Sequence, residues 1–108
     1  MGTPTINELT ETTFTQETSQ PGVQVVDFWA PWCGPCHAMA PQLERAASLR
    51  PQYRFAKVNV DEQPRLAAAF GVQAIPTLAI LRDGELIGTA PGVVPAKSLV
   101  EALDKVAA

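Results

Sequence analysis

A run of apolar residues at positions 23–30, VQVVDFWA, constrains the fold of this chain more than any other segment. Valine, phenylalanine and tryptophan favour β-strands, and here they occupy neighbouring positions rather than every second one. Such a run is typical of a strand that is buried on both faces, as happens when helices cover both sides of a sheet. We therefore expect residues 23–30 to form a central strand.

The next segments follow in an order that predicts parallel pairing. The pattern predicts a helix over residues 33–49, in which Pro35 suits the first turn and Pro41 should introduce a kink. A second strand is expected over residues 55–60. Because a strand, a helix and a strand with short connections form a βαβ unit, the two strands should run parallel.

The remaining elements are expected to be shorter. A short edge strand is expected near Thr5 and Ile6, and Asp83-Gly84 is a strong signal for a hairpin turn. The other expected elements are a helix over 10–18, a short helix within 61–70, strands over 77–81 and 85–89, and a closing helix over 95–106. Together they predict an α/β fold with a central mixed sheet of four to five strands, flanked by helices on both faces.

The composition fits a single domain over residues 1–108 and argues against several classes of function. With 108 residues, of which 46% are hydrophobic, the chain can bury a core without disulfide staples. The net charge of −3 and the absence of a run of Lys or Arg argue against nucleic acid as a partner. The longest apolar runs are too short to span a bilayer, and no secretory signal is visible, so a cytoplasmic protein is expected.

The only two cysteines lie together in the segment WAPWCGPCH, where Gly34 and Pro35 separate Cys33 from Cys36. A structural zinc site needs four ligands, and the neighbouring His37 brings this set only to three, so no metal is expected. Two chains could share an iron–sulfur cluster, which is a less favoured alternative. A structural disulfide that closes so small a loop contributes only about 2 kcal/mol in the chain-entropy model. A reversible redox pair is the alternative that uses the spacing directly.

The spacing of the cysteines suits dithiol chemistry. Residues at i and i+3 lie on one face of a helix, so the two sulfurs can meet. We expect Cys33 at or just before the first helical turn, where free N–H groups and the helix dipole favour thiolate over thiol. The thiolate is the species that attacks a disulfide. Cys36, one turn deeper and less exposed, would then resolve the mixed disulfide.

The succession of a strand, WCGPC and a proline-containing helix resembles the thioredoxin family. The likeness extends from about residue 25 to residue 103 without insertions. The Gly-Pro dipeptide is the thioredoxin form, whereas a histidine would be expected there in oxidising or isomerising relatives. The resemblance implies a general protein-disulfide reductase that needs no cofactor for the exchange and acts on disulfide-containing proteins. It also implies recharging by a separate thioredoxin reductase, an NADPH-dependent flavoprotein, and we expect a monomer.

The resemblance assigns roles to two charged residues outside the cysteine pair. It implies that Asp27 is buried behind the disulfide and exchanges a proton with Cys36. The apolar neighbours of Asp27 support this role, because burial raises the pKa of a carboxyl group. The resemblance places Lys57 near Asp27, where its ammonium would favour the charged carboxylate. For both residues the alternative is an ordinary strand position that faces solvent.

The resemblance also implies a substrate-binding surface, which comprises Trp32, Gly34, Pro35, Ile75, Pro76 and Gly92. Sequence statistics alone favour a trans bond before Pro76. In contrast, the resemblance implies a cis bond that faces the disulfide and leaves the backbone of Ile75 free to pair with an extended substrate. Trp32 is expected to be exposed beside Cys33, and Gly92 is expected to let its loop approach the cysteines closely.

Four residues depart from the common pattern of the family. His37 follows the motif in place of lysine or arginine, and as a residue that titrates near neutral pH it could tune the redox potential. Ala74 and Pro91 replace a frequent glycine and a frequent small aliphatic residue, which could alter partner choice. Pro95 stands where a serine cap is common.

Two functional alternatives are open at this point. One is an oxidase or isomerase of a more oxidising compartment, against which the Gly-Pro dipeptide speaks. The other is a module that binds a partner through the same surface while the cysteines stay redox-idle.

Overall fold

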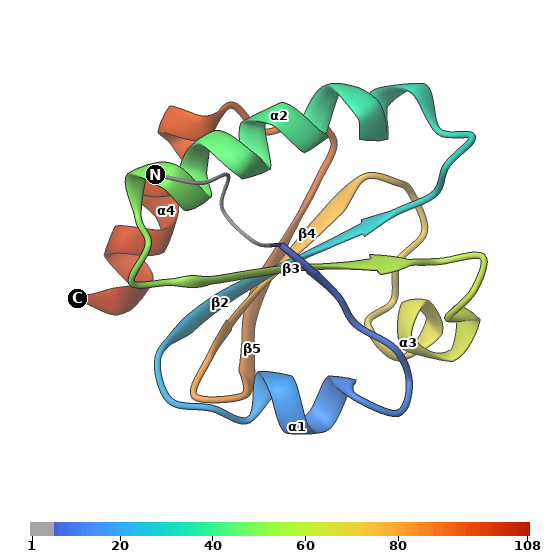
Figure 1. Cartoon of the computed structure of the whole chain (residues 1–108), viewed down its shortest axis with the longest axis horizontal. Helices are drawn as coiled ribbons and strands as arrows, with labels where there is room; N and C mark the ends of the chain where they lie inside the picture. Colours follow the sequence, from blue (N-terminus) through green and yellow to red (C-terminus); the bar gives the residue numbers. More distant parts are fainter. Residues whose placement is uncertain (1–5) are drawn as a thin grey trace.

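A computed structural model describes residues 6–108 (Figure 1). The strands are β1 (Asn7–Glu8), β2 (Val23–Trp29), β3 (Arg54–Asn59), β4 (Thr77–Arg82) and β5 (Glu85–Pro91), and the helices are α1 (Phe14–Thr18), α2 (Gly34–Leu49), α3 (Pro64–Ala69) and α4 (Ala96–Ala107). The strands form one sheet in the order β1-β3-β2-β4-β5, and helices cover both of its faces. The predicted mixed sheet is confirmed, with five strands.

Strand β2 lies at the centre of the sheet, as the sequence predicts. It pairs in parallel with β3 and antiparallel with β4, and every residue from Val23 to Phe28 is buried. Alternate side chains of a strand point to opposite faces. Val25 packs in the cluster that contains residues of α2 and α4, whereas Val26 and Phe28 pack in the second cluster. Asp27, two positions after Val25, therefore points to the face that α2 covers.

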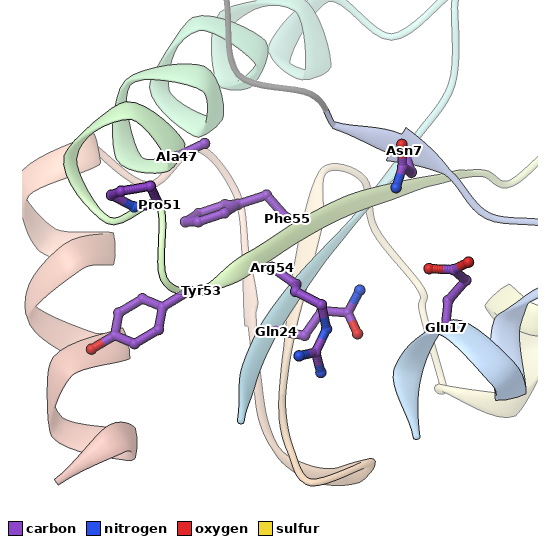
Figure 2. Close-up of a pocket in the computed structure, with 8 residues that line it drawn as sticks. All are labelled: Asn7, Glu17, Gln24, Ala47, Pro51, Tyr53, Arg54 and Phe55. Atoms are coloured by element: carbon purple, nitrogen blue, oxygen red, sulfur yellow. The ribbon is translucent and has the colours of Figure 1, made fainter. Parts of the chain in front are cut away.

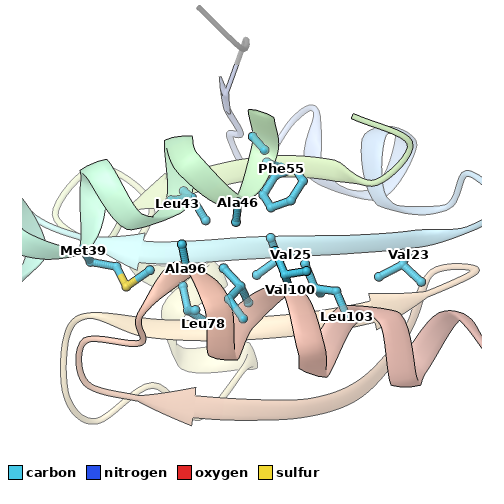
Figure 3. Close-up of a cluster of buried hydrophobic side chains, with 12 residues drawn as sticks. Val23, Val25, Met39, Leu43, Ala46, Phe55, Leu78, Ala96, Val100 and Leu103 are labelled. Carbon is cyan, nitrogen blue, oxygen red and sulfur yellow. The ribbon is translucent and has the colours of Figure 1, made fainter. Parts of the chain in front are cut away.

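Helices α2 and α4 pack together on one face of the sheet (Figure 3). From α2 come Met39 and Leu43, and from α4 come Leu99 and Leu103. Each large apolar side chain that is fully buried contributes about 1.5–3 kcal/mol. This layer fixes the height of α2, and hence of the cysteines at its start, above β2.

The edge strand is found next to its expected position. β1 comprises Asn7 and Glu8. Thr5 lies outside the described residues, and Ile6 precedes the strand. The strand is fixed by its parallel pairing with the middle of β3. This tertiary contact, rather than local β-propensity, selects Asn7 and Glu8 for the strand.

Helix α1 is shorter than expected, because it begins at Phe14 rather than near Thr10. The N–H of Thr10 donates to Oγ1 of Thr13 at 3.0 Å. Such side-chain bonds offer the backbone an alternative to helix, so the segment before Phe14 forms a turn. The other strands and long helices begin and end within two residues of their expected positions. Among the helices of residues 6–108, none is both long enough and apolar enough to cross a membrane.

The hairpin between β4 and β5 turns at Asp83-Gly84, as predicted. Asp83 has a φ of 53° and Gly84 a φ of 85°, so both central residues adopt the left-handed conformation that a tight hairpin requires. A Cβ at Gly84 would also lie 3.2 Å from the Cα of Ser19. The turn therefore needs glycine for its conformation and for its close approach to the end of α1.

The N-terminus of α4 is capped by a side chain from α2. Pro95 occupies the N-cap position and supplies no side-chain acceptor. Instead, Oε1 of Gln42 accepts the N–H of Ala96 at 2.8 Å. The first N–H groups of a helix lack partners within the helix, so this bond satisfies one of them and ties the two helices together.

Replacement of Gln42 by alanine should lower the free energy of unfolding by about 1 kcal/mol, because the N–H of Ala96 loses its acceptor. Urea denaturation of the oxidised protein measures this loss. Gln52→Ala is the matched control, because Gln52 is exposed in the turn that follows α2. It should change stability by less than about 0.5 kcal/mol. Equal effects of the two substitutions would contradict the assignment of Gln42 as the cap.

Candidate functional site

The two cysteines lie where β2 leads into α2, as predicted. Cys33 is the N-cap residue, and the helix begins at Gly34. The Cα atoms of Cys33 and Cys36 are 5.3 Å apart, and their side chains form a disulfide. The backbone N–H of Cys36 donates to Sγ of Cys33 at 3.2 Å. The sulfur of Cys33 therefore takes the place that a side-chain oxygen takes in an ordinary N-cap.

The start of α2 favours a negative charge on this sulfur once the disulfide is reduced. Pro35 lies in the first turn and has no N–H to offer, whereas Cys36 contributes an N–H that has no partner within the helix. A donor aimed at the sulfur and the positive end of the helix dipole both stabilise thiolate relative to thiol. The local backbone thus prepares Cys33 for nucleophilic chemistry.

The two cysteines differ less in exposure than expected. Cys33 is 4% exposed and Cys36 is 3% exposed. The two sulfurs differ instead in what they face. Sγ of Cys33 lies 3.7 Å from the carbonyl oxygen of Ile75, and Cys36 lines an inner pocket together with Asp27.

This inner pocket, of about 240 Å³, connects Cys36 with β2 and β3. Its lining comprises Ile6, Asp27, Trp29, Cys36, His37, Ala40, Leu43 and Lys57. Asp27 is 2% exposed, and its Oδ1 has no hydrogen-bond partner in residues 6–108. The pKa of Asp27 is raised from its ordinary 3.8 to about 7, mainly by burial, and this net value includes a lowering by Lys57 and a further raising by Glu8. Asp27 can therefore gain or lose a proton near neutral pH in the same pocket as Cys36.

The expected proximity of Lys57 to Asp27 is confirmed, because the two residues are direct partners in the parallel register of β2 and β3. The Lys57 ammonium also lies 5.0 Å from the centroid of the Trp29 ring. Trp29 is only half-buried. Lys57 is therefore next to Asp27 in the register, and its cation lies against an aromatic face.

The outer side of the disulfide is surrounded by exposed groups. Trp32 is 70% exposed, as predicted, and its indole N–H donates to Oδ2 of Asp61 at 2.8 Å. Gly34 and Pro35 are exposed as well. Next to Trp32 lies a pocket of about 210 Å³, which is lined by Trp32, Val60, Ala67, Val72, Gln73, Ala74 and Ile75. This surface is open to an approaching chain.

The Ile75–Pro76 bond is cis, in agreement with the resemblance. The carbonyl oxygen of Pro76 accepts the N–H of Gly92 at 2.8 Å, which joins the two loops beside the disulfide. The reason expected for Gly92 is wrong, however. A Cβ at this position would meet no atom within 4 Å, so close packing does not require glycine. The φ of +86° does require it.

Three of the four residues that depart from the family pattern lie at or near this site. Ala74 and Pro91 both line a pocket of about 300 Å³ that adjoins the surface around Trp32. Nε2 of His37 lies 2.6 Å from the carbonyl oxygen of Pro31. Since a carbonyl only accepts, Nε2 is the donor, and the bond ties α2 to the loop that precedes the cysteines.

A second polar pocket, of about 290 Å³, lies where β2 and β3 begin, whereas the cysteines follow the end of β2 (Figure 2). It is lined by Asn7, Glu17, Gln24, Ala47, Pro51, Tyr53, Arg54 and Phe55. Arg54 donates to the carbonyl oxygens of Gln20 and Pro21. A seven-residue strand spans about 20 Å, so this pocket takes no part in the chemistry of the disulfide.

Two residues at the site were missed by the sequence reasoning. Asp61 holds the ring of Trp32, and nothing in its sequence context distinguishes it from any other acidic residue after a strand. Glu8 forms an ion pair with Lys57, with Oε1 and Nζ 4.0 Å apart. Its position next to Lys57 depends on the register of β1 with β3, to which local β-propensity gives no guide.

Comparison with known proteins identifies this arrangement. The model of the family described as Thioredoxin matches residues 5–105. Over 99 residues the chain is 44% identical to thioredoxin 1 of Synechococcus elongatus, covering 90% of this chain and 92% of that protein. Over 101 residues it is 45% identical to thioredoxin of Listeria monocytogenes, covering 93% of this chain and 97% of that protein.

The fold agrees with the sequence comparison. The crystal structure of mitochondrial thioredoxin 3 from Saccharomyces cerevisiae, in its oxidized form, superposes with a TM-score of 0.85 at 38% sequence identity. The match covers 93% of this chain and 94% of the yeast chain. The arrangement of helices and strands around the disulfide is therefore that of the thioredoxin fold.

Asp27 should make stability depend on pH. Its pKa is about 7 in the folded protein, against an ordinary value of 3.8. Between these values the folded chain binds a proton that the unfolded chain releases, so the free energy of unfolding falls as the pH rises from about 4 to about 7. Each unit of difference in pKa corresponds to about 1.36 kcal/mol. The free energy of unfolding therefore falls by at most about 4 kcal/mol, and this full decrease is reached above pH 7.

We therefore expect Asp27→Asn to stabilise the oxidised protein more at pH 8 than at pH 4.5, as measured by urea denaturation. The asparagine cannot ionise, so its burial involves no pH-dependent penalty. Glu85→Gln removes an exposed carboxylate from β5 and serves as the control. A gain from Asp27→Asn that is the same at both pH values would show that the aspartate is not held protonated by burial.

Proposed function

Since this chain belongs to the thioredoxin family and is a protein-disulfide oxidoreductase, we propose that Cys33 attacks substrate disulfides and that Cys36 resolves the product. The observation that carries this assignment is the N–H of Cys36, which donates to the sulfur of Cys33 and to no other sulfur. The protein acts on disulfide-containing substrates and depends on a reductase that returns its electrons.

In the first step, the thiolate of Cys33 attacks one sulfur of a substrate disulfide. A bond forms between Cys33 and that sulfur, the substrate S–S bond breaks, and the second substrate sulfur leaves as a thiolate that takes up a proton. The helix start supports the negative charge on Cys33 before the attack. Because this sulfur lies 3.7 Å from the carbonyl oxygen of Ile75, which belongs to the proposed docking surface, it is the one that a docked substrate would meet.

In the second step, Cys36 attacks the sulfur of Cys33. The thiol of Cys36 must first lose its proton, and we propose Asp27 as the acceptor because both residues line the same inner pocket. A base whose pKa lies near the working pH is best suited to this transfer. The mixed disulfide breaks, the substrate leaves fully reduced, and the protein keeps the Cys33–Cys36 disulfide. Lys57 would stabilise the carboxylate form of Asp27.

We propose that substrates dock on the surface formed by Trp32, Gly34, Pro35, Ile75, Pro76 and Gly92. An extended segment can pair with the backbone at Ile75, so that recognition depends little on side chains. The indole of Trp32 provides an exposed apolar contact, which Asp61 holds in position. The open space in front of Gly34 and Gly92 leaves room for a chain that crosses the disulfide.

For recharging, we propose an NADPH-dependent flavoprotein reductase as the partner. The exchange leaves the protein oxidised by two electrons, and thiol exchange itself involves no nucleotide. We also propose that the protein works in the cytoplasm, because a disulfide reductase needs a compartment that is kept reducing.

Variants of the two cysteines test the assignment. Cys36→Ser should trap a covalent mixed disulfide with insulin, visible by mass spectrometry, because the resolving sulfur is missing. Cys33→Ser should trap none. If Cys33→Ser trapped the mixed disulfide and Cys36→Ser did not, Cys36 would be the nucleophile and Cys33 the resolving cysteine. If the Cys33→Ser, Cys36→Ser double variant retained the biological function of the protein, the redox-idle binding alternative would replace this proposal.

Asp27→Asn should slow release of substrate from the mixed disulfide on the order of tenfold or more near pH 7, because Cys36 loses its proton acceptor. A single-turnover measurement of insulin reduction between pH 6 and pH 9 gives the rate. The deficit should shrink toward high pH, where hydroxide removes the proton. A pH–rate profile that matches the parent protein would exclude Asp27 as the acceptor.

A further inference from the structure

Three charged residues form a row across the neighbouring strands β1, β3 and β2. The register pairs Glu8 with Lys57, and it pairs Lys57 with Asp27. Side chains at directly paired positions lie on the same face of a sheet. One ammonium group therefore lies between two carboxyl groups, one at the edge of the sheet and one in its centre.

The ammonium of Lys57 lies within ion-pair distance of Glu8 and not of Asp27. Its Nζ lies 4.0 Å from Oε1 of Glu8 and 5.0 Å from the centroid of the Trp29 ring. Within residues 6–108, Asp27 takes part in no salt bridge, and its Oδ1 accepts no hydrogen bond. Asp27 thus forms no ion pair with Lys57, although the two residues are neighbours in the register.

Exposure to solvent explains why Lys57 pairs with the carboxyl group of Glu8 and not with that of Asp27. The side chains of Lys57 and Glu8 are 34% and 46% exposed, so their charges remain partly hydrated. Asp27 is almost completely buried. An ion pair with Asp27 would draw the ammonium into the apolar interior, whereas the pair with Glu8 leaves it at the boundary with water.

We propose that Glu8 is a positioning residue for the redox reaction: its carboxylate holds the Lys57 ammonium toward the edge of the sheet and so keeps Asp27 free of an ion pair. The proposal rests on the proposed role of Asp27 as the proton acceptor of Cys36. A carboxylate that is tightly paired with lysine is a weaker base and would accept a proton from a thiol less readily. The opposite influences of Lys57 and Glu8 on the pKa of Asp27 agree with this role.

Few other titratable groups face Asp27. Helix α2 contributes Cys36 and His37 to the same pocket, and β4 places the apolar Leu78 opposite Asp27. In the oxidised protein the disulfide keeps Cys36 from titrating. The oxidised form therefore removes the titration of Cys36 from the measurement, and His37 is the same in every variant compared.

The decisive measurement is a ¹³C NMR titration of the Asp27 side-chain carboxyl in the oxidised protein. Strands separated by one intervening strand lie about 10 Å apart. At that distance, loss of the Glu8 charge and the release of Lys57 toward Asp27 should together lower the pKa of Asp27 by about half a pH unit or more in Glu8→Gln. Lys57→Met should raise it. In the Lys57→Met background, Glu8→Gln should lower it by much less, because only direct repulsion is left.

The control is Glu85→Gln, which removes an exposed carboxylate from β5 at the opposite edge of the sheet and should leave the titration unchanged. Glu8 is itself partly exposed, and Gln preserves the backbone pairing of β1, which amide spectra verify. No shift in Glu8→Gln, or an equal shift with and without Lys57, would overturn the proposal.

The reaction provides a second readout. In Glu8→Gln, the acid limb of the pH–rate profile for insulin reduction should move to lower pH by the same amount as the titration. A titration shift without a shift of the rate profile would overturn the positioning role. The titration measures the pKa of Asp27 without any turnover, so it tests the role of Glu8 alone. If Asp27 is not the proton acceptor, the rate of Asp27→Asn will be unchanged, whatever the titration shows.

Discussion

Strand β2 is hydrogen-bonded along both edges and covered by helices on both faces, and this double burial determines the properties of the site. A carboxyl group in such a strand is almost completely removed from water, so protonation is more favourable for Asp27 than for an ordinary aspartate. The same strand ends directly at the turn that carries the cysteines. One structural element therefore carries the proposed proton acceptor and leads into the turn of the proposed nucleophile.

The disulfide divides its surroundings into an outer and an inner side. On the outer side, separate loops meet: the segment around Trp32, the cis Ile75–Pro76 bond and the loop at Gly92, which is bonded to Pro76. On the inner side lies the closed pocket of Asp27. The two cysteines are almost equally buried, and the roles proposed for them rest on these two environments. The proposed docking surface and the proposed proton acceptor therefore lie on opposite sides of the disulfide.

The sequence predicts the central features of this arrangement because they depend on local signals. The apolar run at 23–30 indicates the buried strand, and Cys33 with Pro35 marks the start of α2. The exact residues of the edge strand depend on its pairing with β3, to which local β-propensity gives no guide. The ion pair between Glu8 and Lys57 depends on the same β1–β3 register, so it could not be predicted either. Gly92 was correctly singled out, but for the wrong reason, since a left-handed φ cannot be distinguished from close packing in a sequence.

The donor that faces the sulfur of Cys33 is a main-chain group, the N–H of residue 36. Its presence does not depend on which side chain that position carries, and among the common amino acids only proline would abolish it. The electrostatic preparation of the nucleophile is thus inherited with the backbone. Evolution can vary the loops around Trp32, Ala74 and Pro91 to acquire new clients while the reactivity of the thiol is retained.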